Sequence, residues 1–453
     1  MHDNNQVAGR QFTTYAVETT AVLKEQMLNW GDRFNICCFM DNHSYAGAHH
    51  RYECLLAAGA WKWVRLPSGN AFERLQAFAT HAGDWLFGHF GFGLHAELFS
   101  LSPGLPDPAG FPDAYFFVPE HLVLLTESSV RISSYSLAPE QVLRNILQMP
   151  VGKPATAVKP AGHGSRSSPP LVPRLSRAEY IAIVEKLQAH IHRGDCYEIN
   201  FCQEFAASDC AIHPPAVFLE LGRVSPNPFA VYYKLNDSYL LCASPERYIR
   251  LEGGRIWSQP IKGTSPRYIS DGARDAASAE TLVRSEKERA ENVMVVDLVR
   301  NDLSRVCVPG SVEAEEICGV YPFPQVFQMI STVTGLLQEG KNWVDAVAAS
   351  FPMGSMTGAP KKKVLELIRR YETGGRGLFS GAVGYVDPAG NADFNVVIRS
   401  VLYDAARLQL SCCVGSGITW YADPAAEYEE CLHKVSAILQ VLERCGGAGP
   451  ADG

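Results

Sequence analysis

The sequence predicts an α+β fold in which antiparallel strands alternate with amphipathic helices. Strand-like runs are joined by short turns, as at residues 236–238 and 387–391, and this pattern is typical of hairpins. Helical runs begin at helix-starting residues, such as Ser176 and the pair Asp423-Pro424. With 453 residues, of which 47% are hydrophobic and 19% charged, the chain is long enough for a full core.

Composition and charge exclude several classes of protein. The net charge of -8 lacks the positive excess that a nucleic-acid binder needs. The 13 cysteines contain no Cys-x-x-Cys pair, so neither a zinc site nor a redox motif is indicated, and buried thiols are expected. No apolar run reaches membrane-spanning length, and residues 1–10 are polar. We therefore expect a cytoplasmic protein that binds neither nucleic acid nor membranes.

The chain divides into three parts. Residues 1–150 carry short strand-like runs, such as 114–117 and 121–125, and no recognisable motif. Residues 151–174 are rich in proline, glycine and serine, which is typical of a flexible linker or a long loop. The region from 175 to 445 holds all the motifs described below and is the expected catalytic region.

Helices and strands alternate through this third part. The expected elements are a helix at 176–192, a strand at 196–206, a hairpin at 229–235 and 239–243, a helix from 285 towards 300, strands at 379–386, 393–403 and 408–414, and a final helix from 423. The hairpin delivers Glu246 to the end of a strand. On the final helix, Glu427, Glu430 and Lys434 share one face, opposite an apolar face.

One lysine is predicted to lie on a tight turn. Pro260 ends a hairpin strand at 255–258, and Gly263 lets the backbone approach a ligand closely. Lys262 lies between them. A buried lysine has a lowered pKa, so its neutral amine becomes a nucleophile. For Lys262 alone, a solvated surface lysine is the alternative interpretation.

Two Glu-x-x-Glu pairs suggest a site for a hard cation. They are Glu288 with Glu291 and Glu427 with Glu430. Either pair alone also fits a solvated helix face, but carboxylates that converge from two helices could hold Mg²⁺. The small-residue loop at 358–360 could present N–H groups to an anion, and Arg399 could bind a carboxylate. These residues together indicate a small polycarboxylate ligand with Mg²⁺.

Several ordered stretches resemble one family. They are Gly194-Asp195-Cys196-Tyr197, Ser244-Pro245-Glu246, Pro260-Ile261-Lys262-Gly263-Thr264, Ala290-Glu291-Asn292 through Arg300-Asn301-Asp302, Gly358-Ala359-Pro360-Lys361, and Glu427-Tyr428-x-Glu430 with Lys434. In this order they are similar to the motifs of the chorismate-utilising enzymes, over residues 176–440. The resemblance implies large, mainly antiparallel sheets packed face to face in a sandwich flanked by helices. Residues 1–150 would form the N-terminal portion of this intertwined fold.

The resemblance also implies a role for each motif residue. Lys262 would attack C2 of chorismate, and Glu246 would protonate the departing C4 hydroxyl. The residues that would hold Mg²⁺ are Glu288, Glu291, Glu427 and Glu430. The residues that would hold the substrate are Gly263, Thr264, Ser355, Tyr385, Arg399, Gly415, Gly417 and Lys434.

The pKa of the attacking amine is the central expectation. Desolvation and neighbouring cations should lower the pKa of Lys262, and a protonated Glu246 should not oppose this. The alternative is that Lys262 only pairs with Glu246 and orders the loop.

Within the family, Pro-Ile-Lys-Gly-Thr is similar to the aminodeoxychorismate synthase branch. That branch converts chorismate and ammonia to 4-amino-4-deoxychorismate for 4-aminobenzoate and folate. Anthranilate synthases usually carry a small residue at the Lys262 position, and members that use water carry a lysine where this chain has Glu198. Because the chain has no recognisable Cys/His/Glu amidotransferase segment, a separate glutaminase subunit is the expected partner.

Two alternatives stay open at this point: an anthranilate synthase component I, and a non-catalytic subunit that only binds a partner. The second is favoured by Gln328, which stands where the family usually has a histidine. Glutamine donates a hydrogen bond but cannot exchange a proton near neutral pH.

Overall fold

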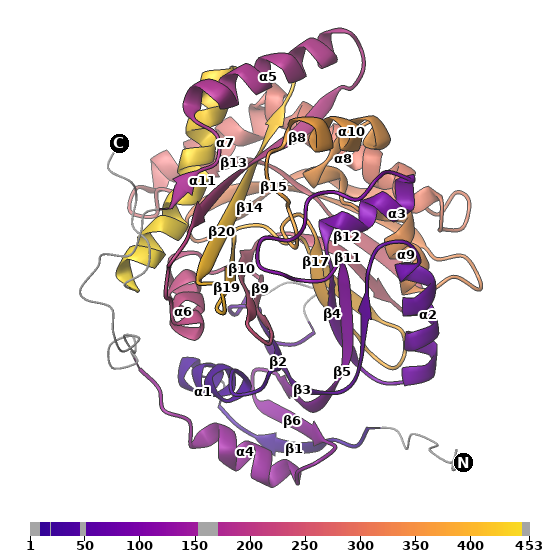
Figure 1. Ribbon diagram of the computed structural model, residues 1–453, viewed down its shortest axis with the longest axis vertical. Helices are drawn as coiled ribbons and strands as arrows, with labels where there is room; N and C mark the ends of the chain where they lie inside the picture. The colour runs from indigo at the N-terminus through magenta and orange to yellow at the C-terminus, as the bar shows by residue number, and fades with distance from the viewer. Residues whose placement is uncertain (1–9, 19, 46–50, 153–170, 446–453) are drawn as a thin grey trace.

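The computed structural model describes residues 10–18, 20–45, 51–152 and 171–445 (Figure 1). Most of the predicted linker at 151–174 lies outside these residues. The strands are β1 (Thr13–Ala16), β2 (Ile36–Asp41), β3 (Cys54–Leu66), β4 (Leu86–Phe90), β5 (Ala114–Leu125), β6 (Ser129–Ser134), β7 (Val172–Pro173), β8 (Glu198–Ala207), β9 (Phe229–Leu235), β10 (Ser238–Ser244), β11 (Arg247–Glu252), β12 (Arg255–Gln259), β13 (Ile261–Pro266), β14 (Glu313–Pro322), β15 (Val326–Leu336), β16 (Gly358–Ala359), β17 (Ala382–Val386), β18 (Ala392–Asn395), β19 (Ser400–Asp404) and β20 (Gln409–Ile418). The α-helices are α1 (Ala21–Gly31), α2 (Ala71–Ala82), α3 (His95–Phe99), α4 (Pro139–Leu147), α5 (Arg177–His192), α6 (Pro214–Val224), α7 (Gly272–Arg284), α8 (Glu286–Ser304), α9 (Trp343–Ser350), α10 (Lys361–Tyr371) and α11 (Pro424–Arg444).

The strands are paired antiparallel wherever they form a ladder, and several ladders join distant parts of the sequence. β2 pairs with β9, β4 with β17, and β8 with β20. The N-terminal strands are therefore built into the same network as the strands of the C-terminal half. No helix in the described part of the chain combines the length and apolar character needed to cross a bilayer.

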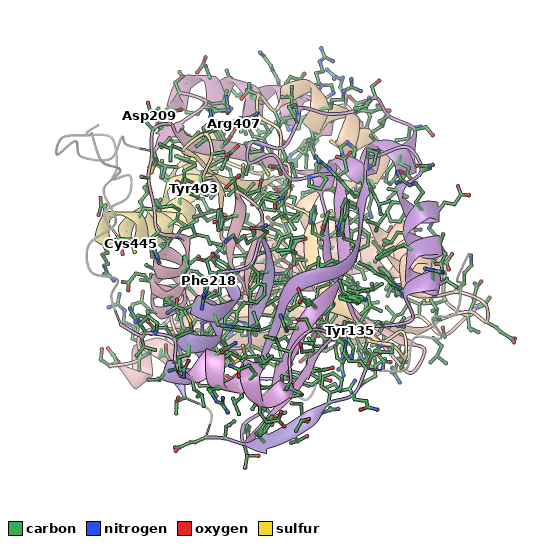
Figure 2. All side chains as sticks on the ribbon, turned by 60° about the horizontal axis from the view of Figure 1, so that its bottom comes forward. Tyr135, Asp209, Phe218, Tyr403, Arg407 and Cys445 are labelled. Carbon is green, nitrogen blue, oxygen red and sulfur yellow. The ribbon has the colours of Figure 1, made fainter. Side chains whose placement is uncertain are left out.

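Three apolar cores show how the layers are stacked. One core contains side chains from strands and their loops, including Phe87 of β4 and Tyr233 of β9, so it lies between facing sheets. A second core joins α1, α4, α5, α6, α10 and α11 to the sheet, and it includes Phe218 of α6 and Tyr403 of β19 (Figure 2). A third core places α2, α8 and α9 against other strands. The predicted α+β sandwich flanked by helices is thus confirmed.

The predicted helix starts agree with the structure. Ser176 forms a capping box with Glu179, and Asp423 accepts hydrogen bonds from the N–H groups of Ala425 and Ala426. Satisfied N–H groups at the first turn stabilise a helix by about 1 kcal/mol. On α11 the predicted apolar face is buried, which aims the opposite face, with Glu430 and Lys434, away from the core.

Some predicted strand limits were wrong. The runs at 114–117 and 121–125 form the single strand β5, because pairing with β3 continues on both sides of Pro119. The run at 393–403 is divided into β18 and β19, because Arg399 adopts φ 52° and interrupts the strand. Pro360 occupies the N-cap position of α10, while Gly358 and Ala359 pair with β8. Beside this pairing, the carbonyls of Ala359 and Thr357 accept hydrogen bonds from the N–H groups of Tyr197 and Asn200.

Candidate active site

Lys262 lies on a strand, not on a turn. β13 begins directly after Pro260 and pairs with β15, with a shift of register between Ile261 and Thr264. Gly263 lies within the shifted segment with φ 94°, a conformation that favours glycine. A Cβ atom there would lie 3.1 Å from Oε2 of Glu288, so glycine allows β13 to approach α8 closely.

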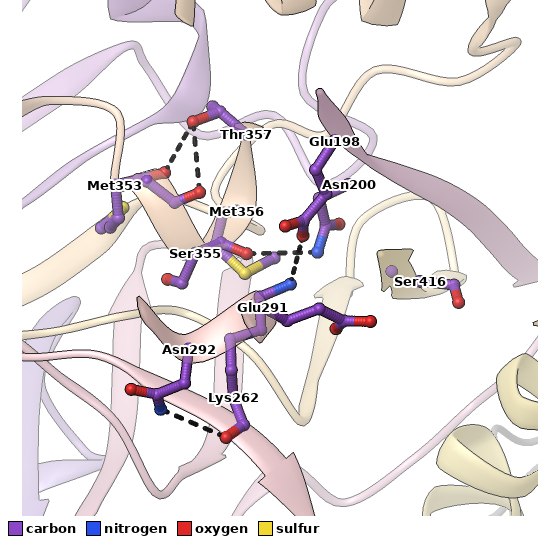
Figure 3. Close-up of polar contacts among 12 residues, drawn as sticks. Glu198, Asn200, Lys262, Glu291, Asn292, Met353, Ser355, Met356, Thr357 and Ser416 are labelled. Carbon is purple, nitrogen blue, oxygen red and sulfur yellow. Dashed lines mark hydrogen bonds and ion pairs between the residues drawn. The ribbon is translucent and has the colours of Figure 1, made fainter. Parts of the chain in front are cut away.

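The ammonium of Lys262 pairs with Glu198 of β8. Nζ donates a hydrogen bond of 2.7 Å to Oε1 of Glu198, and the two side chains are 12% and 3% exposed (Figure 3). Burial alone would lower the pKa of Lys262, but the carboxylates of Glu198 and Glu291 outweigh it and raise the pKa above its ordinary value. The expected lowering of this pKa was therefore wrong. The alternative pairing with Glu246 is also replaced by Glu198.

Glu246 is placed to act as an acid. It lies between β10 and β11, is 4% exposed, and accepts a hydrogen bond of 2.7 Å from the Ser355 hydroxyl. Burial raises the pKa of Glu246 to about 7, although the Ser355 hydrogen bond and the charge of Lys262 oppose the increase. A substantial fraction of Glu246 is therefore protonated near neutral pH. Ser355 was predicted to bind the substrate, but its hydroxyl donates a hydrogen bond to Glu246.

Four carboxylates face one another from two helices. Glu288 and Glu291 lie on α8, and Glu427 and Glu430 lie on α11. Burial raises the pKa of Glu291 to about 7, and it also raises those of Glu288 and Glu427.

Glu430 differs from the other three carboxylates because lysines surround it. Burial would raise the pKa of Glu430, but nearby ammonium groups, first that of Lys434 at 2.5 Å, bring it below its ordinary value. The same lysine donates a hydrogen bond of 2.8 Å to the carbonyl of Gly415. Lys434 thus links α11 to β20 beside the carboxylates.

β20 contributes two glycines to the site. A Cβ atom at Gly417 would lie 3.0 Å from Oε1 of Glu198 and 3.1 Å from Nζ of Lys262. A Cβ atom at Gly415 would overlap Oδ1 of Asn200. A side chain at Gly415 would clash with Asn200, whereas one at Gly417 would require the ends of Glu198 and Lys262 to shift by a few tenths of an ångström. Ser416, which lies between these two glycines in the sequence and is labelled in Figure 3, donates a hydrogen bond from its hydroxyl to Glu427.

The remaining residues that were predicted to hold the substrate have different surroundings. Burial lowers the pKa of Arg399, and the charge of Glu430 opposes the decrease, so this guanidinium lies within electrostatic reach of the site. Thr264 has an exposed side chain, and the buried Gln328 lies opposite it on β15. The ring of Tyr385 packs with those of Tyr52, Trp85 and Phe87.

Three polar residues around Lys262 were not among the predicted site residues. Glu198 pairs with the central lysine, and Asn200 donates a hydrogen bond of 3.2 Å to the carbonyl of Ser355. Asn292 donates one of 3.3 Å to the carbonyl of Lys262 (Figure 3). Polar residues alternating along a predicted strand, as Glu198 and Asn200 do, were an available signal that one face of β8 lines a polar site.

The donor chemistry fits a hard cation that keeps open positions. Oε1 of Glu291 is buried and has no hydrogen-bond partner within the described residues. Carboxylate oxygens suit Mg²⁺, which usually takes one or two carboxylates and completes its shell with water and substrate. Among the residues that the structure describes, no group of three or more His, Cys, Asp or Glu side chains is placed so that it could hold a metal ion. An Mg²⁺ ion at these carboxylates would therefore need water and substrate to complete its shell.

Known proteins resemble this chain in sequence and in fold. Aminodeoxychorismate synthase component 1 of Salmonella typhimurium is 42% identical over 269 residues, which cover 59% of this chain and 58% of that protein. Anthranilate synthase component 1 of Streptomyces coelicolor is 32% identical over 373 residues, covering 78% of this chain and 71% of that protein. The match to the first relative thus spans less than two thirds of its length.

The fold comparison and the family comparison agree. The crystal structure of anthranilate synthase component I from Streptococcus pneumoniae TIGR4 superimposes with a TM-score of 0.72 and 23% identity, covering 87% of this chain and 93% of that chain. The family described as chorismate binding enzyme matches residues 38–440. The resemblance predicted from the motifs is confirmed. The chain belongs to the chorismate binding enzyme family.

Proposed function

We propose that the chain converts chorismate and ammonia to 4-amino-4-deoxychorismate. The observation that carries this proposal is the buried amine of Lys262, which shares one site with the acid Glu246 and the carboxylate of Glu198. An enzyme that let ammonia attack chorismate directly would have no need for a buried nucleophile there. The 42% identity to a protein named aminodeoxychorismate synthase component 1 supports the same assignment.

The residues divide the proposed chemistry between them. The neighbouring carboxylates favour the ammonium form of Lys262, so it must lose a proton before attack, and Oε1 of Glu198 at 2.7 Å is an acceptor within reach. The neutral amine then forms a C–N bond at C2 while both ring double bonds shift, from C1=C2 to C1=C6 and from C5=C6 to C4=C5. The C4–O bond breaks with this shift, and the departing oxygen takes the proton of Glu246 and leaves as water. Ammonia attacks C4, both double bonds shift back, and the bond from C2 to Lys262 breaks. The freed amine recovers its proton from Glu198, and Glu246 recovers its proton from the nitrogen added at C4.

The proposal includes an Mg²⁺ ion bound by the carboxylates of α8 and α11. Glu291 and Glu430 would hold it, with Glu288 and Glu427 beside them. When bound there, the ion would neutralise the ring carboxylate of chorismate. Arg399 and Lys434 supply further positive charge for the dianionic substrate.

The product of the purified chain tests the proposal. We expect chorismate, Mg²⁺ and ammonium to give a product with the mass of aminodeoxychorismate that stays unaromatised without a lyase. Samples quenched without ammonia should show a substrate-derived mass on Lys262 in the wild type and in Glu246→Gln, but not in Lys262→Ala. Lack of any turnover would favour the non-catalytic, partner-binding role, and turnover without an adduct would remove the covalent route.

A second candidate function is that of an anthranilate synthase component I. The relative of that name from Streptomyces coelicolor matches a larger share of this chain, 78%, than the Salmonella protein does. Anthranilate is aromatic and fluorescent, so the same incubation distinguishes the two reactions. A fluorescent product with the mass of anthranilate would replace our proposal.

We also propose a separate glutaminase partner that supplies the ammonia. The relatives named component 1 support a two-component enzyme. Glutamine should fail to support the isolated chain, whereas ammonium salts at raised pH should work because they contain free ammonia. Glutamine-dependent turnover by the pure chain would contradict the need for a partner.

A further inference from the structure

Lys287 lies between the two pairs of carboxylates. It is the second residue of α8, and its Nζ lies 3.8 Å from Oε1 of Glu427 and 4.0 Å from Oε1 of Glu291. The two carboxylates come from different helices and are 5% and 13% exposed, whereas the Lys287 side chain is 54% exposed. An ammonium that reaches in from solvent therefore bridges the groups that face the proposed cation site.

The three lysines of the site are held with different firmness. Lys262 donates a hydrogen bond of 2.7 Å to Glu198, and Lys434 donates one of 2.8 Å to the carbonyl of Gly415. Within the described residues, Lys287 is held only by its two ion pairs, both longer than a hydrogen bond. It is the most exposed and the most loosely held cation of the three, so it is the one that a competing cation would displace.

Charge explains why a cation lies there at all. Four carboxylates close together repel one another, and a cation between them relieves the repulsion. Oε1 of Glu291 is buried without a hydrogen bond, so the ammonium at 4.0 Å supplies electrostatic compensation without satisfying that oxygen. A divalent ion bound to the same oxygen would face the ammonium at short range, where like charges repel.

We propose that Lys287 is the resident cation of the substrate-free site, which it yields to Mg²⁺, and that this competition weakens the affinity of the site for the metal. The proposal rests on the proposed function, because it assumes the Mg²⁺ site on α8 and α11. It adds that the ammonium of Lys287 compensates the negative charge of the carboxylates when the metal is absent. Mg²⁺ binding then includes the cost of moving an ammonium into solvent.

Removal of this charge should tighten metal binding. One unit charge within about 5 Å of the ion, in a partly solvated site, changes affinity by roughly three- to tenfold. The gain should shrink as salt is added, because exposed charges are screened. Lys287→Arg keeps the charge and should bind Mg²⁺ like the wild type.

The test measures metal binding by the full chain without substrate. Isothermal titration with Mg²⁺, repeated with Mn²⁺ followed by its electron paramagnetic resonance signal, should show tighter binding for Lys287→Met only. The matched control is Lys341→Met, which removes another exposed lysine that pairs with a carboxylate four residues later, Asp345. Its affinity for both ions should equal that of the wild type.

Three results would overturn the proposal. Unchanged affinity in Lys287→Met would show that the ammonium does not compete, and weaker affinity would place Lys287 among the groups that help to hold the ligand. An equal increase in Mg²⁺ affinity in Lys341→Met would show that the effect comes only from the change in net charge. Absence of saturable Mg²⁺ binding in the wild type and in both variants would remove the metal site itself, which is a failure of the proposed function and distinguishable from the first three.

Discussion

Nζ of Lys262 lies 2.7 Å from Oε1 of Glu198, although 64 residues separate the two along the chain. β13 supplies the lysine and β8 supplies the glutamate, and Gly417 of β20 leaves the space in which they meet. The carboxylate of Glu198 raises the pKa of the amine and so favours its ammonium form. Activation of the amine is therefore a proton transfer inside the site and not a property of an isolated lysine.

Lys262→Ala should lower stability as well as abolish the adduct. Removal of one partner of a buried pair leaves a buried charge, which costs about 3 kcal/mol. The double variant Lys262→Ala/Glu198→Gln should recover most of the lost stability, because the amide of the new glutamine carries no charge. Urea unfolding of the two variants checks this. Equal stabilities of Lys262→Ala and wild type would show that Glu198 is compensated by other groups.

Ser355→Ala should shift the pH profile. The Ser355 hydroxyl donates to Glu246 and lowers its pKa, so its loss should move that pKa above 7. The decline of kcat/KM at high pH, where Glu246 loses its proton, should then move up by about one pH unit. Ser304→Ala, an exposed serine on the same α8 helix that carries Glu291, is the control. A profile identical to wild type would separate Ser355 from the acid.

Stability of the metal-free chain should fall as the pH rises. The pKa of Glu246 is raised from 4.5 to about 7, so its contribution is fully present below pH 4.5 and is lost as the pH passes through about 7. The loss amounts to at most about 3 kcal/mol. The stability of Glu246→Gln should be less sensitive to pH between 5 and 8, measured by urea unfolding with a chelator, and Glu288, Glu291 and Glu427, whose pKa values are also raised, contribute to the remaining sensitivity. The same slope in both proteins would contradict the raised pKa.

Gly417→Ala should reduce turnover with little effect on the fold. The added methyl would lie 3.1 Å from Nζ of Lys262 and 3.0 Å from Oε1 of Glu198, and both are ends of flexible side chains that can shift. A small displacement of the nucleophile should cost about tenfold in kcat. Gly272→Ala, where no atom lies within 4 Å of the new carbon, should leave kcat unchanged. The melting temperature serves as the check on folding.

Glu430→Gln should weaken Mg²⁺ activation and activity together. Its carboxylate faces those of α8, and Lys434 keeps its pKa below the ordinary value, so it is ionised and ready for a cation. We expect the Mg²⁺ concentration at half activation to increase about tenfold. Glu429→Gln removes an exposed neighbouring carboxylate that pairs with Arg177, and it should behave like the wild type. Unchanged Mg²⁺ activation would remove Glu430 from the site.

Local signals in the sequence predicted the starts of two helices correctly. Ser176 and Asp423 cap helices because their side chains bond to N–H groups two or three residues away, so the sequence nearby contains the whole interaction. The resemblance likewise identified Lys262, Glu246 and the four carboxylates. Residues whose environment is local, or whose motif is shared, were therefore within reach of the sequence.

Interactions between distant segments were not predictable in the same way. Pro260 indicated the end of a strand, but pairing with β15 starts a new strand directly after it and carries Lys262. The left-handed backbone at Arg399 has no signature in its sequence neighbours. Tyr385 packs with rings from the N-terminal third, and Glu198 reaches Lys262 only because β8 and β13 meet in three dimensions.

The pairing of β8 with β20 also bears on how the chain is made. During translation, β2, β4 and β8 leave the ribosome long before the strands β9, β17 and β20 that pair with them. Until then their edges are open to pairing with other chains, which is a route to aggregation. Lys262 and Glu246 emerge well before β20 and α11, which supply Gly417 and Glu430 to the site. A newly made chain therefore depends on protection of these edges until β20 has left the ribosome.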